Sequence, residues 1–179
     1  MIKLGAKELR VTTAQEEHKR LLKKNPIYII VDNVLDTYNI GSIFRLADAC
    51  AVEKVYLCGG TETPPNSRIK KASINTTEWV EWAYAETAVS AVESLKLKVE
   101  NLMVVSIEQS EKSVAYDAVD YTFPVALIIG HETDGVSKEA MEASDFIIEM
   151  PMWGVNKSLN VMVSLGIVLY EVMKRRTNQ

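Results

Sequence analysis

Two patterns of hydrophobic and polar positions alternate along the chain. Short unbroken apolar runs, of which Ile27–Val31 is the first, have the length and β-branched composition of strands buried on both faces. Between such runs, apolar residues recur every three or four positions, as at Ile40, Ile43 and Ala47, which indicates helices with one buried face. The alternation predicts an α/β fold with a mainly parallel sheet flanked by helices.

The same patterns give approximate bounds for each element. The expected strands are 27–31, 55–57, 102–107, 125–129 and 146–148, with a brief extended piece at 79–82. The expected helices are 12–24, 40–51, 86–97, 137–143 and 158–175, and a long irregular loop follows the second strand. Thr13 and Glu16 fit a capping box for the first helix, and Asn25-Pro26 ends it. We therefore expect a helical extension over 1–25 and the main domain over 26–179.

The last helix differs from the others because it lacks a polar face. From Leu159 to Met173 almost every position before Glu171 is apolar. A helix that is apolar all round is buried all round. In a chain of 179 residues, we expect one flank of this helix to pack against a second copy of the chain. The alternative is that it forms the central core helix of a monomer.

Composition limits the class of protein. A hydrophobic fraction of 47% and a charged fraction of 25% exclude general disorder. Cys50 and Cys58 cannot build a disulfide framework, and with His18 and His131 they do not match the spacing of a zinc finger, so we expect no metal and a reduced, cytoplasmic protein. No apolar run is long enough to span a membrane, and the N-terminus is too polar for a signal peptide.

The net charge of −4 argues weakly against a general nucleic-acid binder, because binding to phosphates needs clustered Lys and Arg. Three basic runs could nevertheless form a local face. They are Lys19, Arg20, Lys23 and Lys24; then Arg68, Lys70 and Lys71; and then Lys174, Arg175 and Arg176. Solvated surface side chains explain each run equally well, so both interpretations stay open.

Three polar loops that contain glycine follow strand ends, where ligands bind in open parallel sheets. They are 32–42, 130–137 and 150–160. The glycine-rich motifs that bind nucleotides and the serine motif of esterases are absent. His131, Glu132 and Asp134 are too close together on one loop to converge on a metal ion.

These loops carry three ordered segments with a recognisable spacing. The segments are Asn33-x5-Asn39-Ile40-Gly41-x3-Arg45-x2-Asp48-Ala49, Ile128-Ile129-Gly130-x-Glu132-x2-Gly135-Val136-Ser137 and Met150-Pro151-Met152-x5-Ser158-Leu159-Asn160-Val161. Together they resemble the motifs of the SpoU/TrmH family, which are RNA ribose 2′-O-methyltransferases of the SPOUT superfamily. The resemblance covers residues 26–173. It implies a deep trefoil knot in the C-terminal part, S-adenosylmethionine bound by the knotted loops, and a homodimer with active sites near the interface.

The resemblance also implies roles for single residues. The implied catalytic residues are Arg45, Asn39, Glu132, Ser158 and Asn160. The implied cofactor-binding residues are Ile107, Gly130, Gly135, Met150, Met152 and Leu159. In the family, the arginine of the first motif holds the target phosphate and assists the 2′-hydroxyl, so this role is implied for Arg45. His131 stands where relatives often have asparagine, which leaves the contact there open.

Structural roles compete with several of these assignments. Asn39 and Ser158 are each natural N-caps of the helix that follows. Arg45 is spaced to pair with Asp48 on the helix surface, and Glu132 is explained equally by a solvated loop. Asn160, by contrast, falls inside an apolar helix, where a polar side chain needs a partner, and this favours a functional role.

The sequence thus predicts an enzyme that transfers a methyl group from S-adenosylmethionine to a ribose 2′-hydroxyl of structured RNA, either tRNA or rRNA. The alternative is a noncatalytic RNA-binding or assembly protein that retains the fold. A third possibility is a methyltransferase that acts on a base or a small molecule, but the arginine of the first motif and the Ser158–Asn160 pair favour ribose.

Overall fold

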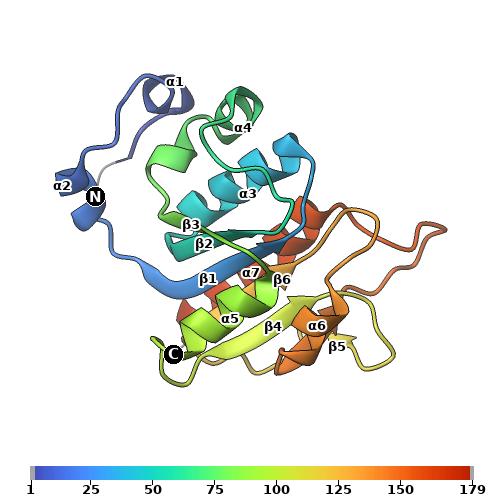
Figure 1. Ribbon diagram of the computed structural model, residues 1–179. Helices are drawn as coiled ribbons and strands as arrows, with labels where there is room; N and C mark the ends of the chain where they lie inside the picture. Colours follow the sequence, from blue (N-terminus) through green and yellow to red (C-terminus); the bar gives the residue numbers. More distant parts are fainter. Residues whose placement is uncertain (1–2, 178–179) are drawn as a thin grey trace.

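Seven strands form one sheet in the order β3-β2-β1-β6-β4-β7-β5, and every pair of neighbouring strands runs parallel. This computed structural model describes residues 3–177 (Figure 1). The strands are β1 (Asn25–Asp32), β2 (Val52–Cys58), β3 (Trp82–Ala85), β4 (Met103–Ile107), β5 (Val114–Ala115), β6 (Val125–Ile129) and β7 (Phe146–Glu149). The predicted α/β fold with a mainly parallel sheet is confirmed.

Helices cover both faces of this sheet. They are α1 (Ala6–Leu9), α2 (Glu16–Arg20), α3 (Thr37–Ala49), α4 (Ser67–Ser73), α5 (Ala88–Lys96), α6 (Lys138–Glu142) and α7 (Val161–Thr177), with a short 3₁₀ helix, η1 (Thr76–Glu78). Side chains of α3, α4 and α7 share one buried cluster with the sheet, and those of α5 and α6 share another. Figure 1 shows the sheet between these two layers.

The central strand β1 illustrates why the apolar runs are unbroken. Ile29 and Val31 point into the cluster under α3 and α7, whereas Ile30 points into the cluster under α5. Successive side chains of a strand alternate between faces, so a strand covered on both faces needs apolar residues at every position.

The N-terminal part of the chain is less helical than its sequence suggests. The predicted helix over 12–24 is wrong, because only Glu16–Arg20 is helical. Its N-cap is Gln15, which makes no side-chain capping bond, so the capping box of Thr13 and Glu16 does not form. The exposed side chains of Val11 and Leu21 show why: this segment gains little packing to support a longer helix.

The predicted irregular loop after the second strand contains α4. Its start is fixed by Asn66, whose Oδ1 accepts hydrogen bonds from the backbone N–H groups of Arg68 (2.8 Å) and Ile69 (3.1 Å). The extended piece predicted at 79–82 is displaced, since the paired strand begins at Trp82. Strand β5 has two residues and gives no periodic signal in the sequence.

Helix α7 begins at Val161 rather than at the predicted residue 158. Ser158 is therefore not its N-cap, and Asn160 lies before the helix rather than inside it. The Oδ1 atom of Asn160 accepts a hydrogen bond from the backbone N–H of Met162 at 2.9 Å, which is the contact that an N-cap makes.

One face of α7 packs on the sheet and on α3, and the opposite face is exposed. The buried side chains are Ser164, Leu165, Val168, Leu169 and Val172. On the outer face, Val163, Ile167 and Tyr170 are 41%, 37% and 58% exposed. The alternative that α7 is the enclosed core helix of a monomer is therefore wrong, because an apolar flank remains uncovered.

Strand order brings the candidate loops to one edge of the sheet. β1 pairs with β6, and β4 pairs with both β6 and β7, so the loops that leave β1, β6 and β7 start close together.

The threading of these loops into a knot stays a prediction, as does the division of the chain at residue 25. Residues 1, 2, 178 and 179, at the ends of the two predicted segments, lie outside the described part. No helix within residues 3–177 is long and apolar enough to cross a membrane.

Candidate active site

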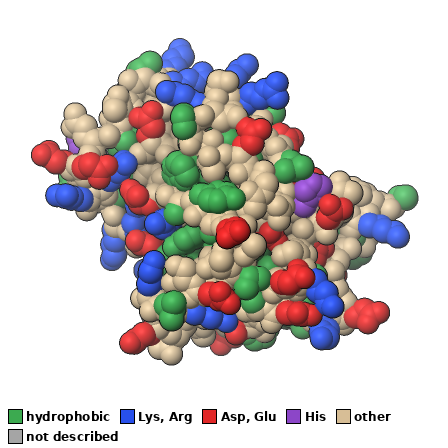
Figure 2. Space-filling view, viewed as in Figure 1, with side chains coloured by type: hydrophobic (Ala, Val, Ile, Leu, Met, Phe, Trp, Pro, Cys, Tyr) green, Lys and Arg blue, Asp and Glu red, His purple; other side chains and the backbone are tan. Residues whose placement is uncertain are grey.

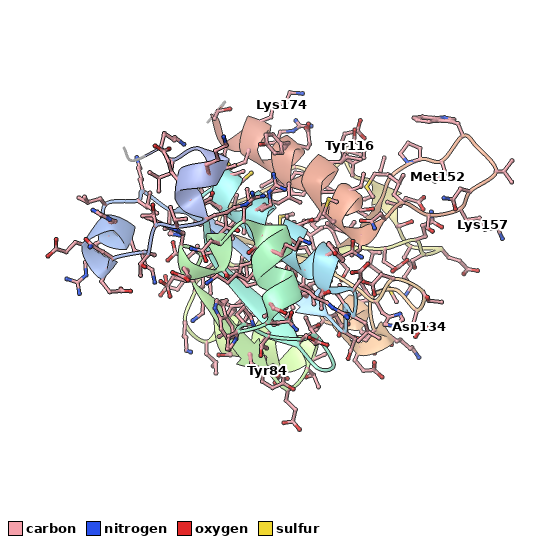
Figure 3. The ribbon with its side chains drawn as sticks, turned by 90° about the horizontal axis from the view of Figure 1, so that it is seen from above. Tyr84, Tyr116, Asp134, Met152, Lys157 and Lys174 are labelled. Carbon is pink, nitrogen blue, oxygen red and sulfur yellow. The ribbon has the colours of Figure 1, made fainter. Side chains whose placement is uncertain are left out.

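A cavity of about 390 Å³ opens where the loops after β4, β6 and β7 meet. This volume is in the range of small-molecule sites. All six of the implied cofactor-binding residues line it, namely Ile107, Gly130, Gly135, Met150, Met152 and Leu159. Figure 3 shows Asp134, Met152 and Lys157 at the same end of the molecule, with the loop over 150–160 projecting beyond α7.

The charged side chains around the cavity are acidic, and the remaining lining is apolar or neutral polar. The carboxylates of Glu108, Glu132, Asp134 and Glu149 are part of the lining, which contains no Lys or Arg among the described residues. Apolar surface comes from Ile107, Ile129, Ile148 and Leu159. This arrangement favours a ligand that carries positive charge on an otherwise apolar body, and it disfavours a phosphate group.

In the turn over 130–135, the backbone at the start of the turn packs closely against the backbone at its end. His131 and Gly135 exchange two hydrogen bonds, from N–H of each to C=O of the other, at 3.0 and 2.9 Å. A Cβ on Gly130 would lie 2.1 Å from the carbonyl carbon of Gly135, and Gly135 itself has φ +73°. Both glycines are therefore required by the turn itself, which presents its residues to the cavity.

His131 has a structural role in this turn. Its Nδ1 accepts hydrogen bonds from the backbone N–H groups of Thr133 (3.0 Å) and Asp134 (3.1 Å). The same nitrogen lies 3.5 Å from the Asp134 carboxylate. An asparagine oxygen could accept the same hydrogen bonds.

Glu132, Asn39 and Asn160 form a chain of hydrogen bonds that joins the three loops. Glu132 Oε1 accepts from Asn39 Nδ2 at 3.0 Å, and Asn39 Oδ1 accepts from Asn160 Nδ2 at 3.0 Å. Glu132 also accepts from the backbone N–H groups of Leu35 (3.2 Å) and Asp36 (3.0 Å). Residues from all three motifs are thus held together beside the cavity.

The ionised form of Glu132 is favoured by these contacts. Burial raises the pKa of its carboxyl group, but the hydrogen bonds from Asn39 and from the backbone at Asp36 and Leu35 lower it by more, so that the pKa lies below its ordinary value. Glu132 is therefore a fixed anion that orients loops. The residue lies on an exposed loop, as the structural alternative expects, but its carboxylate is also held by these hydrogen bonds.

Asn39 is free to bridge because it does not cap α3. Asp36 is the N-cap, and its Oδ1 accepts from the backbone N–H of Tyr38 at 2.8 Å. Asn39 lies in the first turn, 5% exposed, and both ends of its amide are used by Glu132 and Asn160. It does not line the cavity, so it acts through its two partners.

Arg45 lies on the exposed side of α3 and does not line the cavity. It follows Asn39 by six residues, which is about 9 Å along a helix axis. No carboxylate of residues 3–177 lies within 4.0 Å of its guanidinium, so the surface pair with Asp48 does not form. Ser158 is also exposed, and it lines the cavity together with Asn160.

Among the cavity residues that the sequence did not single out, Glu108 and Gln109 connect the loops. Glu108 accepts hydrogen bonds from the backbone N–H groups of Val136 (2.9 Å) and Gln109 (2.8 Å), and Gln109 Nε2 donates to the carbonyl of Lys157 at 2.5 Å. They link the loop after β4 to the other two loops. The available signal was their place directly after a buried strand at the carboxyl edge of the sheet.

The base of the site is fixed by a buried carboxylate at the end of β1. Asp32 is 2% exposed, and its Oδ2 accepts from both the backbone N–H (2.9 Å) and the hydroxyl (2.6 Å) of Ser137. Its neighbour Asn33, at φ 56°, accepts a hydrogen bond from the backbone N–H of Gly60 at 2.8 Å. The ends of β1, β2 and β6 are thereby held together.

Within residues 3–177, no group of three or more His, Cys, Asp or Glu side chains is placed to bind a metal.

Comparison with known proteins places this geometry in a family. A family model described as the SpoU rRNA Methylase family matches residues 26–170. The tRNA (guanosine(18)-2′-O)-methyltransferase of Aquifex aeolicus is 34% identical over 158 residues, which are 86% of this chain and 72% of that protein.

Solved structures agree with this match. The A. aeolicus TrmH/SpoU tRNA modifying enzyme is similar with a TM-score of 0.79 and 30% identity, covering 97% of this chain and 83% of that one. The AdoMet-bound rRNA methyltransferase of Sinorhizobium meliloti has a TM-score of 0.75 and 27% identity, over 93% of this chain and 59% of that one. With a family match over most of its length, the chain belongs to the SpoU rRNA methylase family.

Proposed function

We propose that this chain transfers the methyl group of S-adenosylmethionine to a ribose 2′-hydroxyl of structured RNA, either tRNA or rRNA. The observation that carries the proposal is the arrangement of the three motifs. Their implied cofactor residues line one cavity, and Glu132, Ser158 and Asn160 line it as well. The A. aeolicus relative, named a tRNA 2′-O-methyltransferase, supports the ribose as acceptor, and the AdoMet-bound rRNA methyltransferase of S. meliloti supports the cofactor and an RNA substrate.

The cavity suits S-adenosylmethionine in charge and shape. The cofactor carries a sulfonium, an ammonium and a carboxylate group and is positive overall, and the lining provides acidic residues with no basic side chain among the described residues. Apolar side chains such as Ile107 and Leu159 offer contact surface for an adenine ring, and the backbone of 130–135 offers donors and acceptors. When bound, the cofactor supplies an electrophilic methyl group.

The residues around the cavity then divide into two groups. Glu132 and Asn39 are positioning residues, because their side chains bind the loops and each other. Ser158 and Asn160 face the cavity and can contact the reacting ribose. Arg45 is exposed and has no acidic partner among residues 3–177, which supports its assignment as the residue that holds an RNA phosphate and stabilises the negative charge developing on the hydroxyl oxygen.

The noncatalytic alternative explains less of the structure. A protein that only binds RNA has no need for an acidic, partly apolar cavity, nor for a hydrogen-bonded chain that joins three loops around it. The proposal includes a cytoplasmic location. RNA substrates support it, as do two buried free thiols, Cys50 and Cys58.

The test is transfer of labelled methyl from S-adenosylmethionine to bulk tRNA and to rRNA in separate reactions, followed by nucleoside analysis. A labelled 2′-O-methyl nucleoside from one RNA class is the expected result. A labelled base, or calorimetric binding of S-adenosylmethionine with no transfer to either RNA, would contradict the proposed reaction.

We further propose that the chain forms a homodimer through the exposed face of α7. Val163, Ile167 and Tyr170 follow one another at intervals of four and three, so they share one helix face. Exposed apolar side chains grouped in this way are typical of an interface between protein chains.

The substitution Ile167→Glu is expected to convert the dimer to a folded monomer. The residue is 37% exposed, so a charge there can reach solvent in the monomer but is buried in the dimer. Molar mass from sedimentation or light scattering, with circular dichroism for folding, provides the measurement. The matched control is Leu97→Glu, at a position 87% exposed on the opposite layer, which should leave the dimer intact. A monomeric wild-type chain, or a dimeric Ile167→Glu variant, would refute this interface.

A further inference from the structure

Two of the three basic runs, the C-terminal run and the run on α4, differ in how their charges are used. The C-terminal run is committed to contacts within the chain. Lys174 and Arg175 both pair with Glu171, at 3.7 and 2.7 Å, and Arg176 donates from Nε to Asn25 Oδ1 at 2.8 Å. Arg176 also lies over the ring of Phe123. Arg175 and Arg176 hold the last helix to the body of the protein through Asp117 and Asn25, whereas Lys174 stays exposed.

The run on α4 is exposed and mostly unpaired. Lys70 approaches Glu78 at 3.6 Å, whereas Arg68 and Lys71 have no carboxylate within 4.0 Å among residues 3–177. Arg68 and Lys71 are three residues apart in α4, so they share one face of this helix.

The N-terminal segment adds further charge beside α4. Asn75, just after α4, donates from Nδ2 to the backbone carbonyls of Leu9 and Thr12, both at 3.3 Å. These bonds hold α1, with the exposed cations Lys7 and Arg10, next to α4. Figure 2 shows Lys and Arg side chains gathered along the top of the molecule, where Figure 1 places α1 and α4.

We call this surface the α1–α4 face, and it is defined by Lys7, Arg10, Arg68, Lys70 and Lys71. Its five cations outnumber the acidic side chains among them. Glu8 accepts from the backbone N–H of Gly5, Glu62 accepts from Asn66, and Glu78 pairs with Lys70. A chain with net charge −4 therefore carries one local surface that is suited to phosphate groups.

A second cavity, of about 520 Å³, opens beside α4 and shares Lys70 with the face. Its other lining residues are Pro64, Pro65, Asn66, Ser67, Thr77, Glu78 and Trp82. The half-buried indole of Trp82 and the two proline rings provide flat apolar surface, and Asn66 and Thr77 provide polar groups. Lys70, which also approaches Glu78, is the cation in this lining. An aromatic wall beside a cation is an arrangement that can bind an unpaired nucleobase and its phosphate.

The α1–α4 face is also continuous with Arg45. A Cβ on Gly41 would lie 2.5 Å from Ala72 Cβ and 2.9 Å from the carbonyl oxygen of Ile69, so α3 packs against α4 at this glycine. Arg45 follows Gly41 by one helical turn and thus lies on the same side of α3. RNA that contacts α4 therefore reaches the residue placed to hold its target phosphate.

We infer that the α1–α4 face binds the phosphate backbone of the RNA substrate, and that the Trp82 cavity takes one unpaired base of that RNA. The inference rests on the proposed function and names the surface by which this chain selects its substrate. Backbone contacts supply affinity, whereas the cavity supplies a preference for RNA with unpaired nucleotides.

The first test reverses charge on α4. The double variant Arg68→Glu/Lys71→Glu is expected to raise the Kd for an RNA stem-loop by about tenfold or more near 0.1 M salt, and to reduce the salt dependence of binding. Binding of S-adenosylmethionine should be unchanged. The matched control is Lys96→Glu/Lys98→Glu, which makes the same charge change at the end of α5, on the opposite layer. Equal RNA affinity of the two double variants would overturn the assignment of the face.

The second test concerns the base. The wild-type chain is expected to bind a stem-loop more tightly than a fully paired duplex of the same length, and Trp82→Ala should abolish this preference. Trp82→Phe retains a ring and should keep most of it, which separates loss of stacking from loss of folding. An unchanged preference in a folded Trp82→Ala variant would remove the cavity from the inference. If the wild-type chain binds S-adenosylmethionine but neither RNA, then the proposed function itself fails.

Discussion

Replacing Arg45 by alanine will lower the rate of methyl transfer at saturating RNA by at least about 100-fold, the scale of losing one preorganised group that stabilises transition-state charge. The side chain is exposed, does not line the cavity, and has no carboxylate partner among residues 3–177, so its removal disturbs neither the fold nor the cofactor. Initial rates with labelled cofactor give the loss, and calorimetry should show unchanged binding of S-adenosylmethionine.

Two further variants show whether position 45 is special. Arg45→Lys keeps the charge but loses the planar fork that matches a phosphate, so it should recover only part of the rate. Arg20→Ala removes an equally exposed arginine from α2, outside the α1–α4 face, and should react like the wild type. If Arg45→Ala turned over as fast as Arg20→Ala, then Arg45 would have no part in the mechanism.

The layers of the fold were predictable from the sequence because the spacing of apolar residues follows which faces of a strand or helix are buried. The unbroken run in β1 and the apolar spacing of α3 each reflect which faces are covered, and those faces are set by residues close together in the chain. The N-cap of α3 was misassigned because the loop before it offers two polar residues, Asp36 and Asn39. Either residue can cap the helix. The Asn39 amide instead forms hydrogen bonds with Glu132 and Asn160, which are distant in sequence, so Asp36 is the N-cap.

The start of α7 could not be found from periodicity either. Apolar residues continue from Leu159 into the helix, so the pattern extends the helix backward to Ser158. In the structure, Leu159 is 38% exposed and lines the cavity, because a ligand site rather than the core sets its character. An apolar residue at a ligand site has the same sequence signature as a core residue.

The candidate site was predictable as far as the motifs extend. Their order and spacing identified the loops that meet at the cavity, and nine of the eleven implied residues line it. Glu108 and Gln109 belong to none of these motifs and were missed. The contacts of the C-terminal basic run could not be predicted either, because its partners, such as Asn25 and Phe123, are distant in sequence.

The substitution Gly130→Ala will abolish binding of S-adenosylmethionine. Its Cβ would lie 2.1 Å from the carbonyl carbon of Gly135 and 2.2 Å from the backbone nitrogen of Val136, which are distances that no folded chain tolerates. The obstructing atoms are backbone, so no side chain can rotate away. The turn must open, which breaks the paired hydrogen bonds of His131 and Gly135 and moves residues that line the cavity. We expect a loss of about 1–3 kcal/mol of unfolding free energy from the forced rearrangement.

Calorimetric titration with S-adenosylmethionine and denaturant unfolding measure the two effects, and Gly154→Ala is the matched control. Gly154 lies in the exposed loop over 150–160, with no atom within 4 Å of an added Cβ, so the same methyl group should leave both quantities unchanged there. If Gly130→Ala bound the cofactor as tightly as Gly154→Ala does, then the turn over 130–135 could open without cost to the ligand. The cofactor would in that case be held by the loops after β4 and β7 alone, and the close packing of the two glycines would serve only the stability of the fold.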